Sequence, residues 1–326
     1  MNATGEIPRR KLGKTGAEVS ALGLGGHHLG DLPTAADAAR LVHEAIDAGI
    51  TFFDNCWEYH NGRSELWMGE ALRGRRDKVF LMTKVCTHGR DGALGTRMLD
   101  QSLRRLETDH LDLWQIHGVA FESDPRLAFA KGGIVEAMER ARKAGKVRFV
   151  GFTGHKDPAL HLAMLEHGFH FDAVQLPLNP FDAQFAFSFE RQVLPELTRR
   201  GIAPLGMKSL GGRADAVRQG VVSAADALSY AMSLPVATTI SGMDSLEVLR
   251  QNLGVARGFT PLSPAAMQAI RERCRGAAGD GRFELYKMSL KYDNPQARRA
   301  HHFPVDDREM EVKEELAAVK STGKVK

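Results

Sequence analysis

Short hydrophobic segments alternate with longer amphipathic segments along most of the chain. The hydrophobic segments lack strict polar alternation, which is typical of parallel strands that are covered on both faces. Eight of them are predicted to be strands, and they lie at residues 21–26, 50–54, 79–84, 111–117, 147–153, 172–178, 202–207 and 237–242. Segments with helical spacing separate all eight.

Glycine marks the ends of several predicted helices. Helical patterns end at Gly49, Gly145, Gly168 and Gly201, and a hydrophobic segment follows each glycine within a few residues. Glycine closes a helix in the left-handed conformation without a Cβ clash, so each one indicates a helix-to-strand junction. Eight β/α units within about 240 residues favour a (β/α)8 TIM barrel over the main alternative, a doubly wound open sheet.

The segment before the first predicted barrel strand reads as a hairpin. Residues 9–22 contain two short strand patterns around the turn residues 13–16, and such a hairpin could close the lower mouth of the barrel. We expect one domain over residues 1–326, with the barrel at about 18–257 and a C-terminal extension at 258–326.

That extension begins with a predicted helix. The helix covers residues 263–275, with Ser263 as its N-cap and Pro264 at the first helical position. The remaining tail, which contains His301 and His302, is either a loop over the barrel or partly disordered.

The composition, 43% hydrophobic and 26% charged, is that of a globular protein. We expect no membrane span and no signal peptide, and polar residues follow Arg9 and Arg10 where a twin-arginine signal needs an apolar region. The three cysteines, Cys56, Cys86 and Cys274, are too widely spaced for a disulfide framework or a metal cluster. These features predict a cytoplasmic protein with reduced thiols.

Basic residues slightly outnumber acidic ones, with a net charge of +4. Basic clusters within residues 73–78 and 142–148 lie at predicted helix ends, where positive charge interacts favourably with the helix dipole. Because aromatic residues are not interleaved with them, we do not expect nucleic-acid binding. Excess positive charge would still attract an anionic cofactor.

Polar residues end three consecutive predicted strands. Asp54, Lys84 and His117 follow hydrophobic segments, and Tyr59 stands five residues after Asp54. Barrel enzymes carry their catalytic groups at the C-terminal ends of strands, so these four side chains should meet on one rim. Each of them alone also has a structural explanation, as a turn cap, a solvated strand end, a core histidine or loop packing.

Together the four residues form a set suited to proton transfer. A nearby ammonium, Lys84, would lower the pKa of the phenol of Tyr59, and Asp54 would pair with that buried ammonium. His117 could then hold and polarise a substrate carbonyl. Because no side chain can supply hydride, carbonyl reduction by this set requires a nicotinamide cofactor.

The four residues and the motifs around them resemble the aldo-keto reductase family. The motifs that carry the resemblance are RKLGKTGAEVSALGLGG, FFDNCWEYHNGRSELWMGEALRG, FLMTKV, LDLWQIH, VQLPLNP and SGMDSLEVLRQNL, which occur in family order over most of residues 9–257. The resemblance implies a barrel with Asp54, Tyr59, Lys84 and His117 as catalytic tetrad. Tyr59 would be the general acid in reduction and the general base in oxidation.

The resemblance also implies an extended nicotinamide dinucleotide across the barrel. Gln175 resembles the glutamine that holds the carboxamide, whereas Thr153 and Gly154 depart from the usual serine and asparagine, and Met207 replaces the usual stacking aromatic. The pyrophosphate would be held by Lys208, Ser209, Leu210, Gly211 and Gly212, with a phosphate also at the helix N-terminus after Gly242, Met243 and Asp244. Gln251 and Asn252 resemble residues that contact adenine.

The choice between NADPH and NADH depends on the ribose 2′-phosphate, which usually pairs with a cation. The matching position here is Val248, Asp244 would repel the phosphate, and Arg250 should face another side of its helix. NADPH is the family default, and NADH is a serious alternative.

Three histidines and a tryptophan, His27, His28, His60 and Trp57, follow the first two barrel strands. We expect them to line the substrate pocket. We expect no metal, because adjacent side chains on a strand point to opposite faces.

The function predicted from these residues is reversible NAD(P)H-dependent reduction of aldehydes or ketones. The alternatives are a cofactor-binding regulatory subunit with little turnover and a Schiff-base lyase that uses Lys84. The expected partner is a small carbonyl compound. The sequence does not determine the physiological substrate. It also does not determine the oligomeric state, and a homo-oligomer is one of the states left open.

Overall fold

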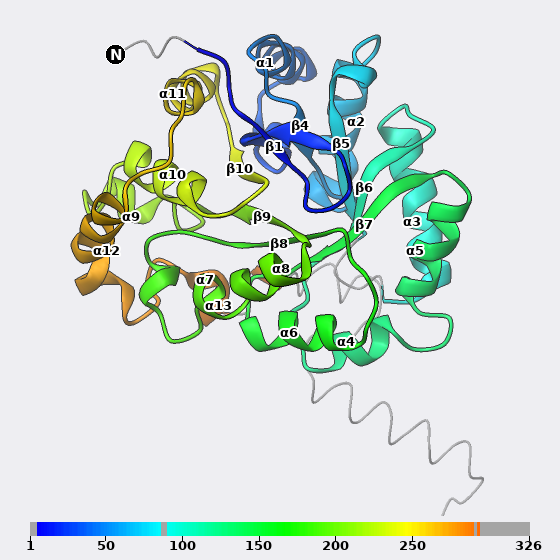
Figure 1. Cartoon of the computed structure of the whole chain (residues 1–326). Helices are drawn as coiled ribbons and strands as arrows, with labels where there is room; N and C mark the ends of the chain where they lie inside the picture. The colour runs from blue at the N-terminus through cyan, green and yellow to red at the C-terminus, as the bar shows by residue number, and fades with distance from the viewer. Residues whose placement is uncertain (1–4, 86–89, 290–291, 294–326) are drawn as a thin grey trace, which may run out of the picture.

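The computed structural model of the protein describes residues 5–85, 90–289 and 292–293. Within these ranges eight parallel strands form a closed barrel ringed by helices (Figure 1). The strands follow one another around the barrel in chain order: β3 (Leu22–Gly25), β4 (Phe52–Asp54), β5 (Phe80–Val85), β6 (Leu111–Ile116), β7 (Val147–Thr153), β8 (Ala173–Pro177), β9 (Ala203–Met207) and β10 (Thr238–Gly242). All eight predicted strands are present, and closure of β10 onto β3 confirms the barrel over the open sheet.

The helices lie outside the barrel and follow the strands in alternation. They are α1 (Ala35–Asp47), α2 (Arg63–Ala71), α3 (Gly92–Arg105), α4 (Ser123–Ala128), α5 (Ile134–Lys143), α6 (Pro158–Glu166), α7 (Phe189–Gln192), α8 (Leu194–Arg200), α9 (Asp215–Arg218), α10 (Ala224–Ser233), α11 (Leu246–Ala256), α12 (Pro264–Ala278) and α13 (Leu285–Met288). Short 3-10 turns are η1 (His28–Asp31), η2 (Tyr59–Gly62), η3 (Arg76–Lys78) and η4 (Asp182–Gln184). Gly49, Gly145, Gly168 and Gly201 all have positive φ, as the helix-end pattern predicted.

The interior of the barrel is filled by side chains from the strands and from the hairpin. The expected hairpin is formed by β1 (Arg9–Lys11) and β2 (Glu18–Ser20). Leu12 and Val19, both fully buried, belong to the same apolar cluster as the strand residues Phe52, Leu113 and Leu205. The hairpin therefore closes one end of the barrel and leaves the other end free of its side chains.

The C-terminal extension folds back over the barrel as far as the structure describes it. Helix α12 starts at Pro264 and is capped by Ser263, whose hydroxyl accepts from the Ala266 amide, as predicted, and it runs three residues beyond the expected end. Beyond it, the Lys287 ammonium lies 2.6 Å from Asp182 and 3.0 Å from Glu284, with all three side chains buried. Within residues 279–289 and 292–293 the tail contains the short helix α13 and packs against η4 through Lys287, whereas His301 and His302 lie outside the described residues.

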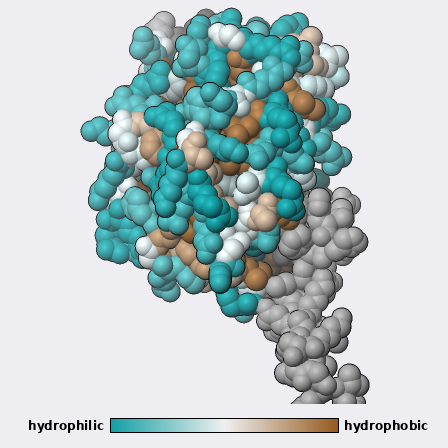
Figure 2. Space-filling view, turned by 90° about the vertical axis from the view of Figure 1, so that its right-hand side faces the viewer, coloured by the Kyte–Doolittle hydropathy of each residue, from teal (hydrophilic) through white to brown (hydrophobic). Residues whose placement is uncertain are grey.

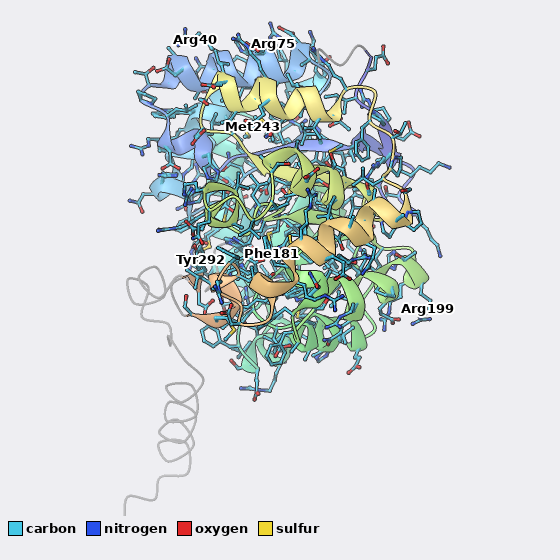
Figure 3. All side chains as sticks on the ribbon, turned by 90° about the vertical axis from the view of Figure 1, so that its left-hand side faces the viewer. Arg40, Arg75, Phe181, Arg199, Met243 and Tyr292 are labelled. Atoms are coloured by element: carbon cyan, nitrogen blue, oxygen red, sulfur yellow. The ribbon has the colours of Figure 1, made fainter. Side chains whose placement is uncertain are left out.

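Hydrophilic residues predominate on the face of the molecule in Figure 2, where apolar residues form only small groups. The peripheral arginines labelled in Figure 3, Arg40, Arg75 and Arg199, each pair with a carboxylate, as expected for solvated surface charge. Within the ranges that the structure describes, no helix has both the length and the apolar character needed to cross a bilayer.

We predict that Lys287→Met destabilises the protein. The substitution leaves the carboxylates of Asp182 and Glu284 buried without their cation, which should cost about 3 kcal/mol of unfolding free energy. Urea unfolding of the variant and the wild type measures this difference in unfolding free energy. The control is Arg282→Ala, which removes only an exposed pair with Asp280 and should leave the unfolding free energy nearly unchanged. Equal stability of the two variants would contradict the buried pair.

Candidate active site

A buried ion pair lies at the open end of the barrel. Asp54 ends β4 and Lys84 lies near the end of β5, and their side chains are only 5% and 1% exposed. The Lys84 ammonium contacts the Asp54 carboxylate directly and donates to the Asn55 carbonyl at 2.8 Å. A carboxylate partner makes it possible to bury this charge, so Asp54 holds Lys84 in one position.

Tyr59 reaches this pair from the turn after β4. Its hydroxyl lies 3.5 Å from the Lys84 ammonium, and its ring is edge-on to His117 with centroids 5.9 Å apart. The turn is tight, since His60 and Asn61 adopt φ values of 52° and 56°. The structure thus brings together the four side chains that the strand-end pattern singled out.

The electrostatic environment of Tyr59 differs from the expectation. Burial raises its pKa well above the usual value, and electrostatic interactions with Asp54, Cys56 and Glu58 raise it further. The expected lowering by Lys84 is wrong because that ammonium is already paired with Asp54. Tyr59 therefore holds its proton at neutral pH and suits the role of an acid.

His117 has a partner that the sequence reasoning missed. Its Nδ1 atom lies 2.7 Å from the Glu58 carboxylate and 3.2 Å from the Cys56 thiol. The Glu58 and His117 side chains are 8% and 14% exposed. The only signal in the sequence was that Cys56 and Glu58 stand close to Tyr59. No local pattern relates residues 56–58 to His117 at the end of β6.

Gln175 connects β8 to the ion pair. Its side-chain nitrogen donates to the second Asp54 oxygen at 3.0 Å. Its side-chain oxygen is buried and has no hydrogen-bond partner among the residues that the structure describes. Thr153 is paired with Gln175 in the sheet, and the Gly154 amide donates to the Gln175 carbonyl. The amide oxygen of Gln175 is therefore an acceptor available to a bound ligand.

The loop after β9 is covered by the C-terminal segment. The Lys208 ammonium lies over the rings of Tyr286 and Tyr292, at 5.1 and 5.3 Å. Burial and the charge of Lys84 lower the pKa of Lys208 to about 8, against the opposing effect of Asp54. A Cβ added to Gly211 would meet the Phe283 carbonyl at 2.8 Å.

The other members of this loop are Met207, Ser209, Leu210 and Gly212: Met207 and Leu210 are partly buried, Ser209 is buried, and Gly212 has a φ of 80°. The loop expected to hold the pyrophosphate is therefore packed on one side against Phe283, Tyr286 and Tyr292, which the sequence did not show.

The segment after β10 divides into exposed and buried positions. Gly242, Asp244 and Gln251 are exposed, whereas the Met243 side chain is fully buried in the core and offers a ligand only its backbone. Asn252 is buried and donates to the Ser241 hydroxyl at 3.1 Å.

Helix α11 starts behind Ser245, whose hydroxyl accepts from the Val248 amide. Arg250 pairs with Glu44 of α1 at 2.7 and 2.9 Å, so it faces another side of this helix, as expected.

Histidines form part of the rim around Tyr59. The His27 ring lies 5.1 Å from the Tyr59 ring and 5.0 Å from the His60 ring, between centroids. His28 packs against Gly242, since a Cβ there would meet its Nδ1 at 2.0 Å. Trp57 instead turns toward α3, where its indole donates to Gln101 at 2.7 Å.

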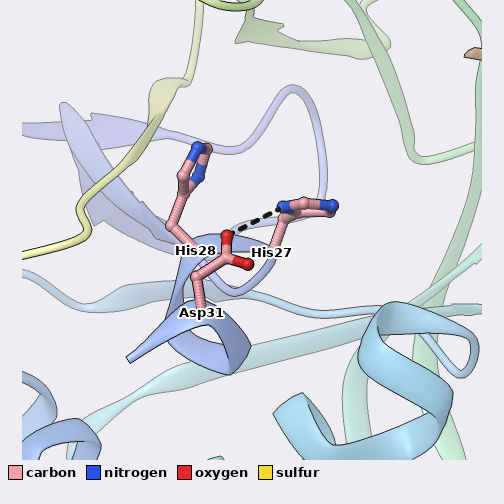
Figure 4. Close-up of side chains that lie close together, drawn as sticks. All are labelled: His27, His28 and Asp31. Carbon is pink, nitrogen blue, oxygen red and sulfur yellow. Dashed lines mark ion pairs between the residues drawn. The ribbon is translucent and has the colours of Figure 1, made fainter. Parts of the chain in front are cut away.

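His27 and His28 occupy a turn and not the strand on which the expectation of no metal was based. His27 and His28 do not lie on a strand but on and just before the turn η1, with rings 5.3 Å apart (Figure 4). One potential ligand atom from each of His27, His28 and Asp31 lies within 4.8 Å of the others, and Cys56, Glu58 and His117 form a second such group. The expectation of no metal stays untested.

The chain is similar in sequence to known oxidoreductases. A family model described as the aldo/keto reductase family matches residues 21–219. An uncharacterized oxidoreductase, YqkF of Bacillus subtilis, is 32% identical over 44% of this chain, and L-galactose dehydrogenase of Arabidopsis thaliana is 33% identical over 46%. The chain spans about half of these two relatives, 48% and 49% of their lengths. A 6-dehydroglucose reductase of Novosphingobium aromaticivorans is 31% identical over 62% of this chain and 69% of its own.

Solved structures share the barrel. The aldo-keto reductase AKR11C1 of Bacillus halodurans, in its holo form, superposes with a TM-score of 0.71 at 22% identity, over 86% of this chain and 100% of its own. An aldo/keto reductase of Klebsiella pneumoniae in complex with NADP and acetate gives a TM-score of 0.68 at 24% identity, over 82% and 96%. Because both sequence identities are below 25%, the structural similarity supports the fold alone.

Proposed function

The chain belongs to the aldo/keto reductase family, and from this we propose that it reduces the carbonyl group of a small aldehyde or ketone, reversibly, with hydride from a nicotinamide cofactor. The observation that carries the proposal is the convergence of Asp54, Tyr59, Lys84 and His117 at the open end of the barrel. Oxidoreductases are among the similar proteins, which supports the reaction class.

Tyr59 is the proton donor in this proposal. Its raised pKa keeps the phenol protonated until negative charge develops on the substrate oxygen. As hydride adds to the carbonyl carbon, the phenolic proton moves to the oxygen and the alcohol forms. The Lys84 ammonium, 3.5 Å away, stabilises the phenolate that remains, and Asp54 keeps that ammonium in place. Alcohol oxidation reverses each transfer.

The residues present fit a nicotinamide. The buried Gln175 oxygen without a partner among the described residues is suited to accept from the carboxamide NH2 group, with Thr153 beside it in the sheet. The cofactor supplies the hydride. Met207, at the end of β9, would contact the nicotinamide, since a methionine can fill the space of a stacking aromatic.

The phosphates would be held at two loops. Residues 208–211 offer the Lys208 charge and backbone amides, and residues 242–244 lead into the N-terminus of α11, where amide groups and the helix dipole favour anions. Gln251 and Asn252 would face the adenine. NADPH is proposed because two similar structures of aldo-keto reductase from Klebsiella pneumoniae have NADP or NADPH bound. NADH stays the alternative, because Asp244 is exposed and Arg250 is paired with Glu44.

The Schiff-base alternative is disfavoured by the contacts of Lys84. Its ammonium hydrogens are engaged by the Asp54 carboxylate, the Asn55 carbonyl and the Tyr59 hydroxyl. A lysine nucleophile needs a free amine lone pair. The second alternative, a cofactor-binding subunit with little turnover, is separated from a reductase by assay of NADPH or NADH oxidation with 4-nitrobenzaldehyde.

We predict that Tyr59→Phe lowers the turnover number for carbonyl reduction by roughly 100-fold or more, because the proton donor is lost. Cofactor affinity, measured by fluorescence titration, should stay within about threefold. Tyr230→Phe is the control, since its hydroxyl binds Glu190 and Arg271 on outer helices. Wild-type turnover in Tyr59→Phe would remove Tyr59 from this role.

We also predict that Lys208→Met raises the Kd for NADPH roughly tenfold at neutral pH, because a cation near the phosphates is lost. Lys208 has a pKa of about 8, so it is charged below that pH and loses its charge above it. Wild-type affinity should therefore fall as pH rises through about 8, and the variant should lack this fall. Arg250→Gln, which breaks an exposed pair, should bind normally. An unchanged Kd and pH profile for Lys208→Met would contradict the assignment.

A further inference from the structure

Glu58 lies directly before Tyr59 and binds the histidine of the proposed tetrad. Its carboxylate is 2.7 Å from Nδ1 of His117, and both side chains are largely buried. We propose that Glu58 is a positioning residue that keeps a proton on Nδ1 of His117 and stabilises the doubly protonated ring during reduction. This inference rests on the proposed function and extends it to a residue outside the tetrad.

The hydrogen bond between the Glu58 carboxylate and Nδ1 of His117 has a defined direction. A carboxylate accepts and does not donate, so Nδ1 of His117 must carry the proton. The remaining nitrogen, Nε2, is then the one available to a substrate. In a neutral ring with its proton on Nδ1, Nε2 only accepts, whereas a carbonyl oxygen requires a donor. His117 can therefore donate to a carbonyl only when both of its nitrogens carry protons, and the Glu58 carboxylate contacts Nδ1 of that ring directly.

The backbone of the turn holds Glu58 in place. The Trp57 amide donates to the Lys84 carbonyl at 3.1 Å, and the Cys56 amide donates to the Asn55 side chain at 2.8 Å. The segment directly before Glu58 is thus anchored to the end of β5. A carboxylate in such a rigid turn orients the imidazole without a large entropic cost at the moment of reaction.

The other titratable groups around His117 come from several elements. Tyr59 and Cys56 face the ring from the same turn as Glu58, and His155 interacts with it from the end of β7. Burial lowers the pKa of His155 to about 4, so His155 is neutral where the enzyme would work. Arg90 donates to the His117 carbonyl at 3.0 Å and pairs with Asp124, so its charge is directed away from the ring. Glu58 therefore supplies the negative charge in direct contact with the imidazole.

The test compares variants over a pH series in carbonyl reduction. Glu58→Gln keeps an acceptor oxygen but removes the charge, and Glu58→Asp keeps the charge on a shorter side chain. Glu70→Gln is the matched control, an equal charge change at an exposed position of α2.

We expect kcat of Glu58→Gln to lie within about threefold of wild type near pH 6, where imidazole protonates readily, and to fall roughly 10-fold or more near pH 8. The alkaline limb of its pH profile moves to lower pH. Glu58→Asp should recover part of the loss, and Glu70→Gln should match wild type. A uniform loss of kcat in Glu58→Gln at every pH, or no loss, would overturn the inference.

A second readout does not depend on turnover. Side-chain nitrogen NMR reports which nitrogens of His117 carry protons, and we expect a proton on Nδ1 in wild type, with or without one on Nε2, and a shift toward the neutral Nε2 tautomer in Glu58→Ala. The same tautomer in both proteins would overturn the proposal even if the enzyme is active. If no carbonyl substrate turns over while the tautomer depends on Glu58, the proposed function fails and the Glu58–His117 contact stands.

Discussion

The candidate site depends on one interaction, the buried pair between Lys84 and Asp54. A buried ammonium is costly without a carboxylate partner, and the pair in turn requires β4 and β5 to lie side by side, with Asp54 level with Met82 and Lys84 two residues further along β5. Gln175 extends the same network to β8 through the second Asp54 oxygen. Three strands are thereby connected by charge and hydrogen bonds at the end where the hairpin does not fill the interior.

This pair also explains why Tyr59 is an acid rather than a readily ionised phenol. Asp54 balances the charge of Lys84. Burial and the interactions with nearby acidic groups therefore affect the pKa of the Tyr59 phenol more than the Lys84 ammonium does. Its proton is kept until charge appears on a bound substrate. The protein would then stabilise a phenolate only during the reaction, when the Lys84 ammonium is the nearest cation.

The C-terminal segment completes the other side of the site. Tyr286 and Tyr292 contact Lys208, while the buried Lys287 attaches the segment to Asp182 beyond β8. The loop after β9 is therefore bordered by residues that are distant in sequence. Its glycines, Gly211 among them, have a packing role beside any role in binding phosphate, since no side chain would fit beneath Phe283.

The sequence by itself determined the eight strands, the glycine helix ends, the hairpin and the identity of the four side chains that meet. These features follow from local periodicity, from backbone preferences and from the rule that parallel strands end together. Only the tertiary structure decided the direction of the Tyr59 pKa shift, the contact of Glu58 with His117, the turn that groups His27 with His28 and the burial of Met243. The physical reason is that burial and charge pairing depend on neighbours far apart in the chain, and a pattern along the chain does not contain those distances.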